Sequence, residues 1–195
     1  MDITKRQMDI VEAAIAIIAR QGYKELTIKN LAQRLGLTEA ALYRHFSSKG
    51  ELIRTILDYF EQLSGDVITA IGEQNLPPLE RIRMFVMNRY RLFTLNPDLA
   101  KVLFSEELFK HDPSLGRHME SIIHAHRDAV IYYITAAQAE GSIRKDLDQV
   151  DLFRIFVGSM RFTVTQWNLS GQRFDLVQAG EHLFNTIVKL IEETT

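Results

Sequence analysis

The chain has no cysteine among its 195 residues. This absence excludes disulfide bridges, zinc sites built on thiolates and redox sensing by a thiol, and it suits a reducing compartment such as the cytoplasm. Proline and glycine are also scarce, with four and ten residues, so long irregular connections have few places to form. With 46% apolar and 25% charged residues, the composition is typical of a globular protein with a sizeable core.

The sequence also lacks the patterns of membrane proteins and enzymes. No apolar run approaches the length of a membrane span, and the first residues, Met1 to Arg6, lack the apolar stretch of a secretion signal. No nucleophile elbow, glycine-rich phosphate loop or HExxH pattern occurs. We therefore expect a protein that is not an enzyme, has no membrane partner and carries neither a cofactor nor a metal ion.

The net charge of −2 hides a difference between two parts of the chain. Residues 1–60 hold nine Lys and Arg against seven Asp and Glu, whereas residues 61–195 hold fourteen against eighteen. The basic surplus is therefore entirely N-terminal. A surplus of this size permits contact with nucleic-acid phosphates without requiring it.

Apolar residues recur with a helical period, and no segment alternates as a strand does. In the first fifty residues the pattern predicts three short helices, with boundaries at Gly22, Thr27 and Thr38. Ser48 and Glu51 have the spacing of a capping box. They predict a fourth helix over 48–74.

The remainder predicts five more helices. They cover 79–95, the segments after Asn96-Pro97 and after Asp112-Pro113, a segment from Asp148 to about Asn168, and 175–192. The predicted fold class is all-α with about nine helices. We expect a domain boundary after residue 47, between an N-terminal domain over 1–47, called the head below, and a C-terminal domain over 48–195, with helix 48–74 connecting the two.

A helix, a turn containing Gly36 and a helix beginning at Thr38 make a helix-turn-helix, whose second helix enters the major groove of DNA. On its outer face Arg44 can bind guanine through two hydrogen bonds, and Glu39 can accept one from the cytosine amino group. Tyr43, His45 and Lys49 suit phosphates. Taken singly, Tyr43 could instead be a core aromatic and His45 a satisfied polar group, while Phe46 is assigned to the core.

The segment around the helix-turn-helix contains a dense pattern of residues, namely Gly22-Tyr23, Thr27-Ile28, Leu31-Ala32, Leu35-Gly36-Leu37, the run Leu42-Tyr43-Arg44-His45-Phe46-Ser47-Ser48-Lys49, and Leu52. With these residues the segment resembles the DNA-binding signature of the TetR family of repressors. The resemblance implies that the head is a DNA-binding domain and that the C-terminal domain binds a ligand and dimerises. Gly50 departs from the family, which often has an acidic residue there. The resemblance implies that phosphates are bound by Thr27, Tyr43, His45 and Lys49, and that bases are met by Thr38, Glu39, Ala40 and Arg44. It further implies a homodimer through the last two helices and release of DNA when a small molecule binds the C-terminal part.

Aromatic and methionine residues are abundant in the C-terminal part and would suit a pocket for an apolar or aromatic effector. The candidate ligand-binding residues are Phe85, Arg89, Phe93, Phe104, His126, Tyr133, Phe156 and Met160. Each of the apolar ones could equally be plain core. Arg89 and Arg161 interrupt apolar stretches, so each could pair with an internal acid or with a carboxylate of the ligand. His126 could bond a ligand, an internal carbonyl or Glu106.

The last two predicted helices carry apolar residues in alternating steps of three and four, as in a packing seam. Candidate dimer residues on this seam are Phe153, Val157, Val164, Trp167, Gly180, Leu183 and Ile187. Two such helices from each of two subunits would form a four-helix bundle. The same periodicity is compatible with packing inside one subunit.

Histidines at 111, 118, 124 and 126 lie near Glu106, Glu107, Asp112 and Met119 and could suggest a metal sensor. Neighbouring histidines on the expected helix do not share a face, which argues against a common metal ion.

The function that the sequence favours is a ligand-responsive transcriptional regulator, most simply a repressor, that binds operator DNA as a homodimer. The alternative is an architectural or nucleoid-associated DNA-binding protein without an effector.

Overall fold

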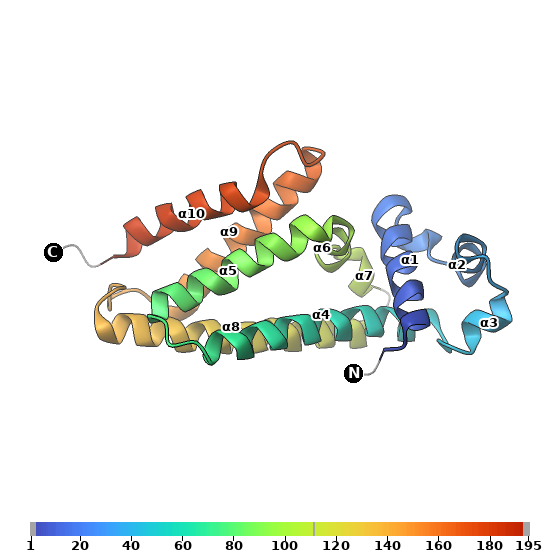
Figure 1. Ribbon diagram of the computed structural model, residues 1–195, viewed down its shortest axis with the longest axis horizontal. Helices are drawn as coiled ribbons and strands as arrows, with labels where there is room; N and C mark the ends of the chain where they lie inside the picture. Colours follow the sequence, from blue (N-terminus) through green and yellow to red (C-terminus); the bar gives the residue numbers. More distant parts are fainter. Residues whose placement is uncertain (1–2, 111, 193–195) are drawn as a thin grey trace. The chain divides into compact units, whose positions relative to one another are not determined.

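The computed structural model (Figure 1) describes residues 3–110 and 112–192. In this part of the chain it contains ten α-helices, one short 3-10 helix and no strand, which confirms the all-α fold class. The helix that the sequence did not predict is α7 (Glu107–Lys110). Four residues are too few to show a helical period. His111, one of the histidines considered above, lies outside the described residues.

The chain divides into two compact units. Unit 1 comprises Met1–Leu63 and Asp98–Ile122, and unit 2 comprises Ser64–Pro97 and Ile123–Thr195. This division differs from the boundary expected after residue 47, because the head shares its unit with the first part of the following helix and with a segment from the middle of the chain.

The head contains α1 (Lys5–Gln21), the 3-10 helix η1 (Tyr23–Glu25), α2 (Ile28–Leu35) and α3 (Glu39–Tyr43). The predicted boundaries are present. Gly22 ends α1 with φ +96°, a value that side chains other than glycine rarely adopt. Gly36 ends α2 in the left-handed region, which turns the chain toward α3. Ile10, Val11, Leu31 and Leu42 are buried in the core of the head.

The long helix α4 (Lys49–Gly72) begins with a capping arrangement slightly different from the expected one. The Glu51 backbone N–H donates to Ser48 Oγ at 3.1 Å, as a capping box requires. The Glu51 carboxylate reaches one residue further back than predicted, and accepts from both Ser47 N and Ser47 Oγ at 2.6 Å. These bonds lower the pKa of Glu51 below its usual range.

The rest of unit 1 comes from α6 (Pro97–Leu103), α7 and the first part of α8 (Pro113–Glu140). Two polar contacts join distant segments here. Arg20 pairs with Asp98 at 3.0 Å, and Arg54 Nη2 donates to Ser114 Oγ at 3.2 Å. Both contacts are exposed, so apolar burial of residues such as Leu99, Val102 and Leu115 stabilises this unit more than they do.

Unit 2 is built around α5 (Pro78–Leu95), α9 (Gln149–Leu169) and α10 (Leu176–Ile191), which pack against one another (Figure 1). Asp148 and Asp175, at the predicted starts of the last two helices, cap α9 and α10 through their side chains. α10 comes very close to α5 at Gly180, where an added Cβ atom would overlap the Tyr90 ring. Glycine is therefore required at this position by close packing within the chain.

Among the described residues, no helix combines the length and the apolar character needed to cross a membrane.

Candidate DNA-binding surface and effector region

The short helix α3 presents its polar side chains to solvent and its apolar ones to the core. Thr38, Glu39, Ala40, Tyr43 and Arg44 are exposed, with Tyr43 at 53% of its full area. In contrast, Leu42 is 1% and Phe46 4% exposed, so these two side chains anchor the helix to the core of the head. The exposure of Tyr43 excludes its alternative assignment as a core aromatic within this chain, while Phe46 is a core residue as predicted.

The helix α3 ends at Tyr43, because the chain turns at Arg44 and His45. The His45 backbone N–H still donates to the Leu42 carbonyl at 2.9 Å, so the turn is fixed to the end of the helix. Arg44 consequently projects from the C-terminal end of α3, and His45 is only half-buried.

Two threonines proposed to contact DNA also start helices. Thr27 Oγ1 accepts from Asn30 N at 3.1 Å, and Thr38 Oγ1 accepts from Ala41 N at 3.2 Å. Each hydroxyl acts as an acceptor in its cap and retains its own proton to donate. An exposed capping threonine can therefore stabilise its helix and donate to a phosphate oxygen at the same time.

Lys49 is more engaged with the head than the sequence suggested. Its ammonium group donates to the Tyr23 carbonyl at 2.7 Å and lies 3.4 Å from the centre of the Tyr23 ring. Partial burial lowers the pKa of Lys49, and the nearby Glu107 partly offsets this effect. The ammonium carries three N–H groups, so the bond to Tyr23 leaves it able to reach a phosphate.

A buried polar group lies in the interior of unit 2, as the sequence predicted for Arg89. The side chain is 1% exposed, Nη1 donates to Ser64 Oγ at 2.6 Å, and the guanidinium lies 5.1 Å from the centre of the Phe85 ring. The His126 ring meets the same Phe85 edge-on at 5.5 Å. Arg89, Phe85 and His126 thus form one cluster contributed by α5 and α8.

Burial affects the two titratable groups of this cluster differently. It lowers the pKa of Arg89 to about 10, so the guanidinium remains charged at neutral pH. Burial, with a smaller contribution from the charge of Arg89, lowers the pKa of His126 to about 4. The cluster therefore combines a cation with a neutral imidazole, two groups able to donate to an anionic or carbonyl oxygen.

The other predicted ligand residues do not all join this cluster. Phe93, Phe156 and Met160 are buried in unit 2, and Phe156 stacks on Phe184 with 5.4 Å between ring centres. Tyr133 lies next to Gly72 and beneath Arg81. Phe104 belongs to unit 1 and is half-buried. Arg161, which also interrupts an apolar stretch, is exposed and so differs from Arg89.

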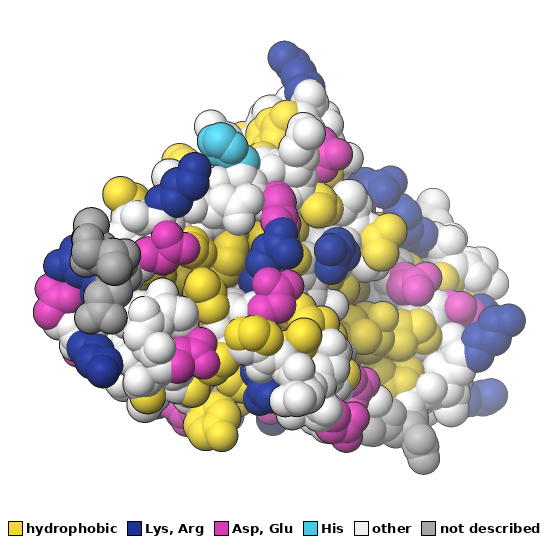
Figure 2. Space-filling model, turned by 60° about the vertical axis from the view of Figure 1, so that its left-hand side comes forward, with side chains coloured by type: hydrophobic (Ala, Val, Ile, Leu, Met, Phe, Trp, Pro, Cys, Tyr) yellow, Lys and Arg dark blue, Asp and Glu magenta, His cyan; other side chains and the backbone are white. Residues whose placement is uncertain are grey.

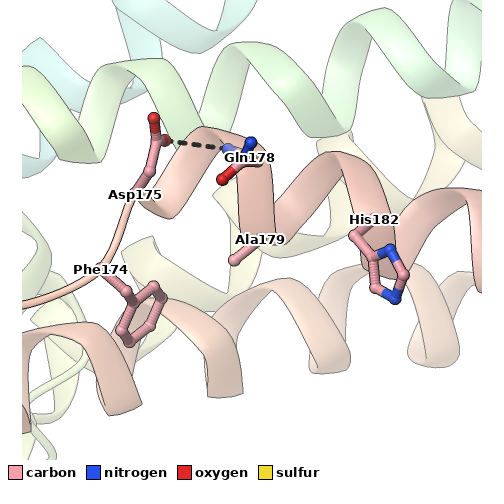
Figure 3. Close-up of a pocket in the computed structure, with 5 residues that line it drawn as sticks. All are labelled: Phe174, Asp175, Gln178, Ala179 and His182. Carbon is pink, nitrogen blue, oxygen red and sulfur yellow. Dashed lines mark hydrogen bonds between the residues drawn. The ribbon is translucent and has the colours of Figure 1, made fainter.

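A pocket that the sequence did not indicate lies beside the first turns of α10 (Figure 3). It has a volume of about 440 Å³ and is lined by Phe174, Asp175, Gln178, Ala179 and His182. Asp175 caps the helix through a 2.9 Å bond from Gln178 N, and the Phe174 carbonyl accepts from Trp167 Nε1 at 2.9 Å. None of its lining residues was among the predicted ligand set. In sequence, only the cap at Asp175 marks this region.

Comparison with known families accounts for most of the chain. Residues 10–56 match the family described as "Bacterial regulatory proteins, tetR family". Residues 60–190 match "YsiA-like protein, C-terminal region". The chain belongs to the TetR family. It is accordingly a DNA-binding transcriptional regulator of the helix-turn-helix type, as the signature around α3 predicted.

Relatives of known name extend over nearly the whole TetR-family chain. The Fatty acid metabolism regulator protein of Bacillus subtilis is 22% identical over 189 residues, covering 95% of this chain and 93% of the relative. The repressor KstR2 of Mycobacterium tuberculosis is 25% identical over 190 residues, covering 92% and 89%. A nucleoid occlusion factor, SlmA of Vibrio campbellii, is 34% identical but over 107 residues, 54% of each chain.

Solved structures confirm the TetR-like fold. The ketosteroid transcriptional regulator KstR2 of M. tuberculosis superimposes with a TM-score of 0.85 at 21% identity, covering 99% of this chain and 98% of that one. The transcriptional regulator FadR of B. subtilis, solved in complex with stearoyl-CoA, gives a TM-score of 0.80 at 22% identity, covering 95% and 99%.

The residues predicted to form the dimer seam lie inside this TetR-family subunit. Phe153, Val164, Trp167, Gly180 and Ile187 are buried by the chain itself, and Val157 and Leu183 are half-buried. The periodic seam therefore packs α9 and α10 onto their own subunit, the alternative that the periodicity left open.

A different row of α9 residues is exposed, namely Ile155 at 46%, Phe162 at 69% and Leu169 at 84%. The spacing of seven positions between these three residues could have revealed the exposed row. The more regular pattern of buried apolar residues on the other face of α9 obscured it.

Proposed function

We propose that the protein is a repressor that binds operator DNA as a homodimer and releases it when an effector with a long apolar part occupies unit 2. The observation that carries this proposal is the division of α3 into an exposed polar face and a buried anchor. An exposed row of Thr38, Glu39, Tyr43 and Arg44 on a firmly held short helix suits base and phosphate contacts in a major groove.

The proposed effector is an acyl-CoA thioester or a molecule of similar shape. The relative solved with stearoyl-CoA covers nearly the whole chain, and the interior of unit 2 is rich in aromatic side chains. An acyl tail would pack among residues such as Phe93, Phe156 and Met160. Arg89 and His126 would meet its polar end, because a buried guanidinium favours a nearby carbonyl or anionic oxygen.

We propose that the dimer forms through the outward face of α9 together with the outward face of α10. Hydrophobic side chains are visible at the surface between charged ones (Figure 2), and the exposed residues Ile155, Phe162 and Leu169 recur every seven positions along one face of α9. Gly158 lies in this row, and a Cβ added there would meet nothing within 4 Å. A second copy of the helix pair could therefore approach closely, forming a four-helix bundle.

The connection between effector and DNA would run through α4. This helix begins directly after the segment that carries Arg44 and His45, and its residues belong partly to unit 1 and partly to unit 2. Two recognition helices must sit about 34 Å apart to read successive turns of DNA. A shift of α4 on effector binding would change that separation and lower operator affinity.

Operator binding tests the first part of this proposal. Footprinting over genomic fragments should reveal a palindromic site, and Arg44→Ala should weaken binding to it by about 10- to 100-fold while barely changing binding to random DNA. Arg34→Ala is the matched control, because it removes the same charge from an exposed position of the head outside the proposed contacts. Equal losses on operator and random DNA for Arg44→Ala would remove Arg44 from base recognition, and absence of any preferred site would overturn the proposal.

Effector binding is tested on the protein–operator complex. Stearoyl-CoA should release the labelled operator, whereas coenzyme A alone, lacking the apolar tail, should not. Stearate provides the tail without the nucleotide and tests whether the tail suffices. Failure of all acyl-CoA chain lengths to bind or to release DNA would overturn the proposed effector class and leave the DNA-binding assignment intact.

The alternative function is an architectural or nucleoid-associated protein without an effector. It is favoured by the 34% identity to the nucleoid occlusion factor SlmA, although that likeness covers 54% of each chain. The two functions differ in binding pattern, because a regulator protects one or a few operators while an architectural protein occupies many sites across the chromosome. Genome-wide mapping of bound DNA separates them.

A further inference from the structure

One cluster of side chains in unit 1 plays no part in the proposed function. Asp58 and Glu61 of α4 and His118 of α8 lie together, with His118 Nε2 at 3.4 Å from Asp58 Oδ1 and 3.1 Å from Glu61 Oε2. Each of the three contributes one metal-ligating atom, and these atoms lie within 4.8 Å of one another. Glu61 and His118 are 57 positions apart in sequence, so spacing along one helix could not reveal the cluster.

We propose that Asp58, Glu61 and His118 form a binding site for a divalent transition-metal ion. The first argument is geometric. Ligand atoms placed about 2.1 Å from one ion, at tetrahedral or octahedral angles, stand about 3.0–3.4 Å apart. The two measured distances from His118 Nε2 match this range, so an ion could enter with small movements of the carboxylates.

The second argument concerns charge and hydrogen bonding. The imidazole Nε2 can carry one proton, yet it faces two carboxylate oxygens. A single N–H cannot bond both of them well, and the two carboxylates bring negative charges close together. Arg54, one turn earlier on α4, donates to Ser114 and acts on Asp58 only through its charge. A divalent cation in the centre would bind all three groups at once.

The donor set and its surroundings indicate the class of metal. One imidazole and two carboxylates suit zinc, nickel, cobalt or manganese better than magnesium or calcium, which prefer oxygen ligands alone. Side-chain exposures of 20% for His118, 31% for Asp58 and 48% for Glu61 leave room for water to complete the coordination. The site therefore resembles open three-ligand sites more than closed structural ones.

A bound ion would fasten α4 to α8 within unit 1. Asp58 and Glu61 lie on the helix that follows the DNA-binding segment, so metal occupancy would hold that helix more firmly against α8. Because an ion that binds only the folded state raises its stability, a zinc concentration about a hundredfold above Kd should raise the melting temperature by about 5–10 °C.

Isothermal titration with Zn²⁺ tests this inference on untagged full-length protein that has been dialysed against chelator. We expect one equivalent of Zn²⁺ per chain, a rise in melting temperature, and visible absorption bands when Co²⁺ is used as a spectroscopic probe. Mg²⁺ at the same concentration should give neither heat nor stabilisation. Saturation by Mg²⁺ with similar affinity would overturn the assigned metal class.

Two variants and two controls make the test specific. Glu61→Gln and His118→Gln should each weaken Zn²⁺ binding by at least about tenfold. Asp66→Asn removes the same charge from an exposed position of α4, and His182→Gln removes an exposed imidazole on α10; both should bind Zn²⁺ as the unaltered chain does. If Zn²⁺ does not bind stoichiometrically, or binds both cluster variants as tightly as the unaltered chain, the three residues form an ion pair only and the inference is wrong. Operator binding is measured separately and does not bear on this outcome.

Discussion

The head and unit 2 place their proposed functional side chains in opposite environments. In the head, Glu39 on the five-residue helix α3 and its capping residues Thr38 and Arg44 are exposed, whereas in unit 2 Phe85, Arg89 and Phe156 are almost fully buried. Apart from Thr38, which caps α3 through its hydroxyl, these proposed DNA-binding side chains therefore contribute little to folding, while the candidate effector residues also form the core. Substitutions should separate function from stability in the head and couple the two in unit 2.

The largest effect expected from this comparison is on stability. Phe156→Ala should lower the free energy of unfolding by about 3–5 kcal/mol, because it removes a buried ring stacked on Phe184. Tyr43→Ala removes an exposed ring from α3 and should change stability by no more than about 0.5 kcal/mol. Denaturant unfolding measures both.

The same two variants should rank differently in DNA binding. Tyr43→Ala should weaken operator affinity although the protein melts normally, while Phe156→Ala should bind the operator at temperatures where it is folded. A Tyr43→Ala protein that is as unstable as Phe156→Ala would break the distinction between the two regions.

Two glycines provide a sharper comparison within unit 2. Gly180→Ala places a methyl group against the buried Tyr90 ring and should destabilise the chain by about 1–3 kcal/mol. Gly158→Ala meets no atom of its own chain and adds a better helix former, so it should stabilise a lone subunit by up to about 1 kcal/mol.

The consequence of Gly158→Ala for assembly depends on the proposed dimer face. If a partner helix packs closely at Gly158, the added methyl should raise the dissociation constant of the dimer even though the subunit itself is more stable. Sedimentation velocity over a concentration series measures this. An unchanged dissociation constant for both Gly158→Ala and Phe162→Ala would place the dimer interface elsewhere.

Arg89 tests whether a core residue of unit 2 also recognises the effector. Arg89→Met keeps most of the side-chain volume and removes a buried charge, so stability should be maintained or increased. Effector-induced release of the operator should require at least about tenfold more ligand, a loss of about 1.4 kcal/mol. Operator release measured with unaltered sensitivity would show that Arg89 has a structural role alone.

The sequence predicted the head better than unit 2, for physical reasons. The caps at Thr27 and Thr38 and the glycine at 36 are local signals, since each acts on residues three or four positions away. The buried state of Arg89 followed from its place in an apolar stretch, yet the same argument failed for the exposed Arg161. Helical period alone does not say which of two apolar faces turns inward.

Long-range arrangements account for the rest. His118 was considered with histidines of its own helix, whereas its closest partners, Asp58 and Glu61, come from α4. Gly180 was predicted to lie at the dimer interface, whereas the closest side chain to it is Tyr90, on α5 of the same chain. In both cases the residue type indicated its role, and only the fold could identify its partner.

The smallest expected effect concerns the start of α4, where the head joins the rest of unit 1. Because hydrogen bonds from Ser47 lower the pKa of Glu51, this carboxylate stabilises the fold above its ordinary pKa, and the contribution disappears as pH falls through the lowered value. Glu51→Gln keeps an acceptor for Ser47 and loses the charge at the helix N-terminus. It should cost roughly 0.3–1 kcal/mol at pH 7, and this cost should shrink as the carboxylate becomes protonated at acidic pH. Unfolding of both proteins over a pH series measures the difference, and a gap that does not change with pH would assign the effect to the hydrogen bonds and not to the charge.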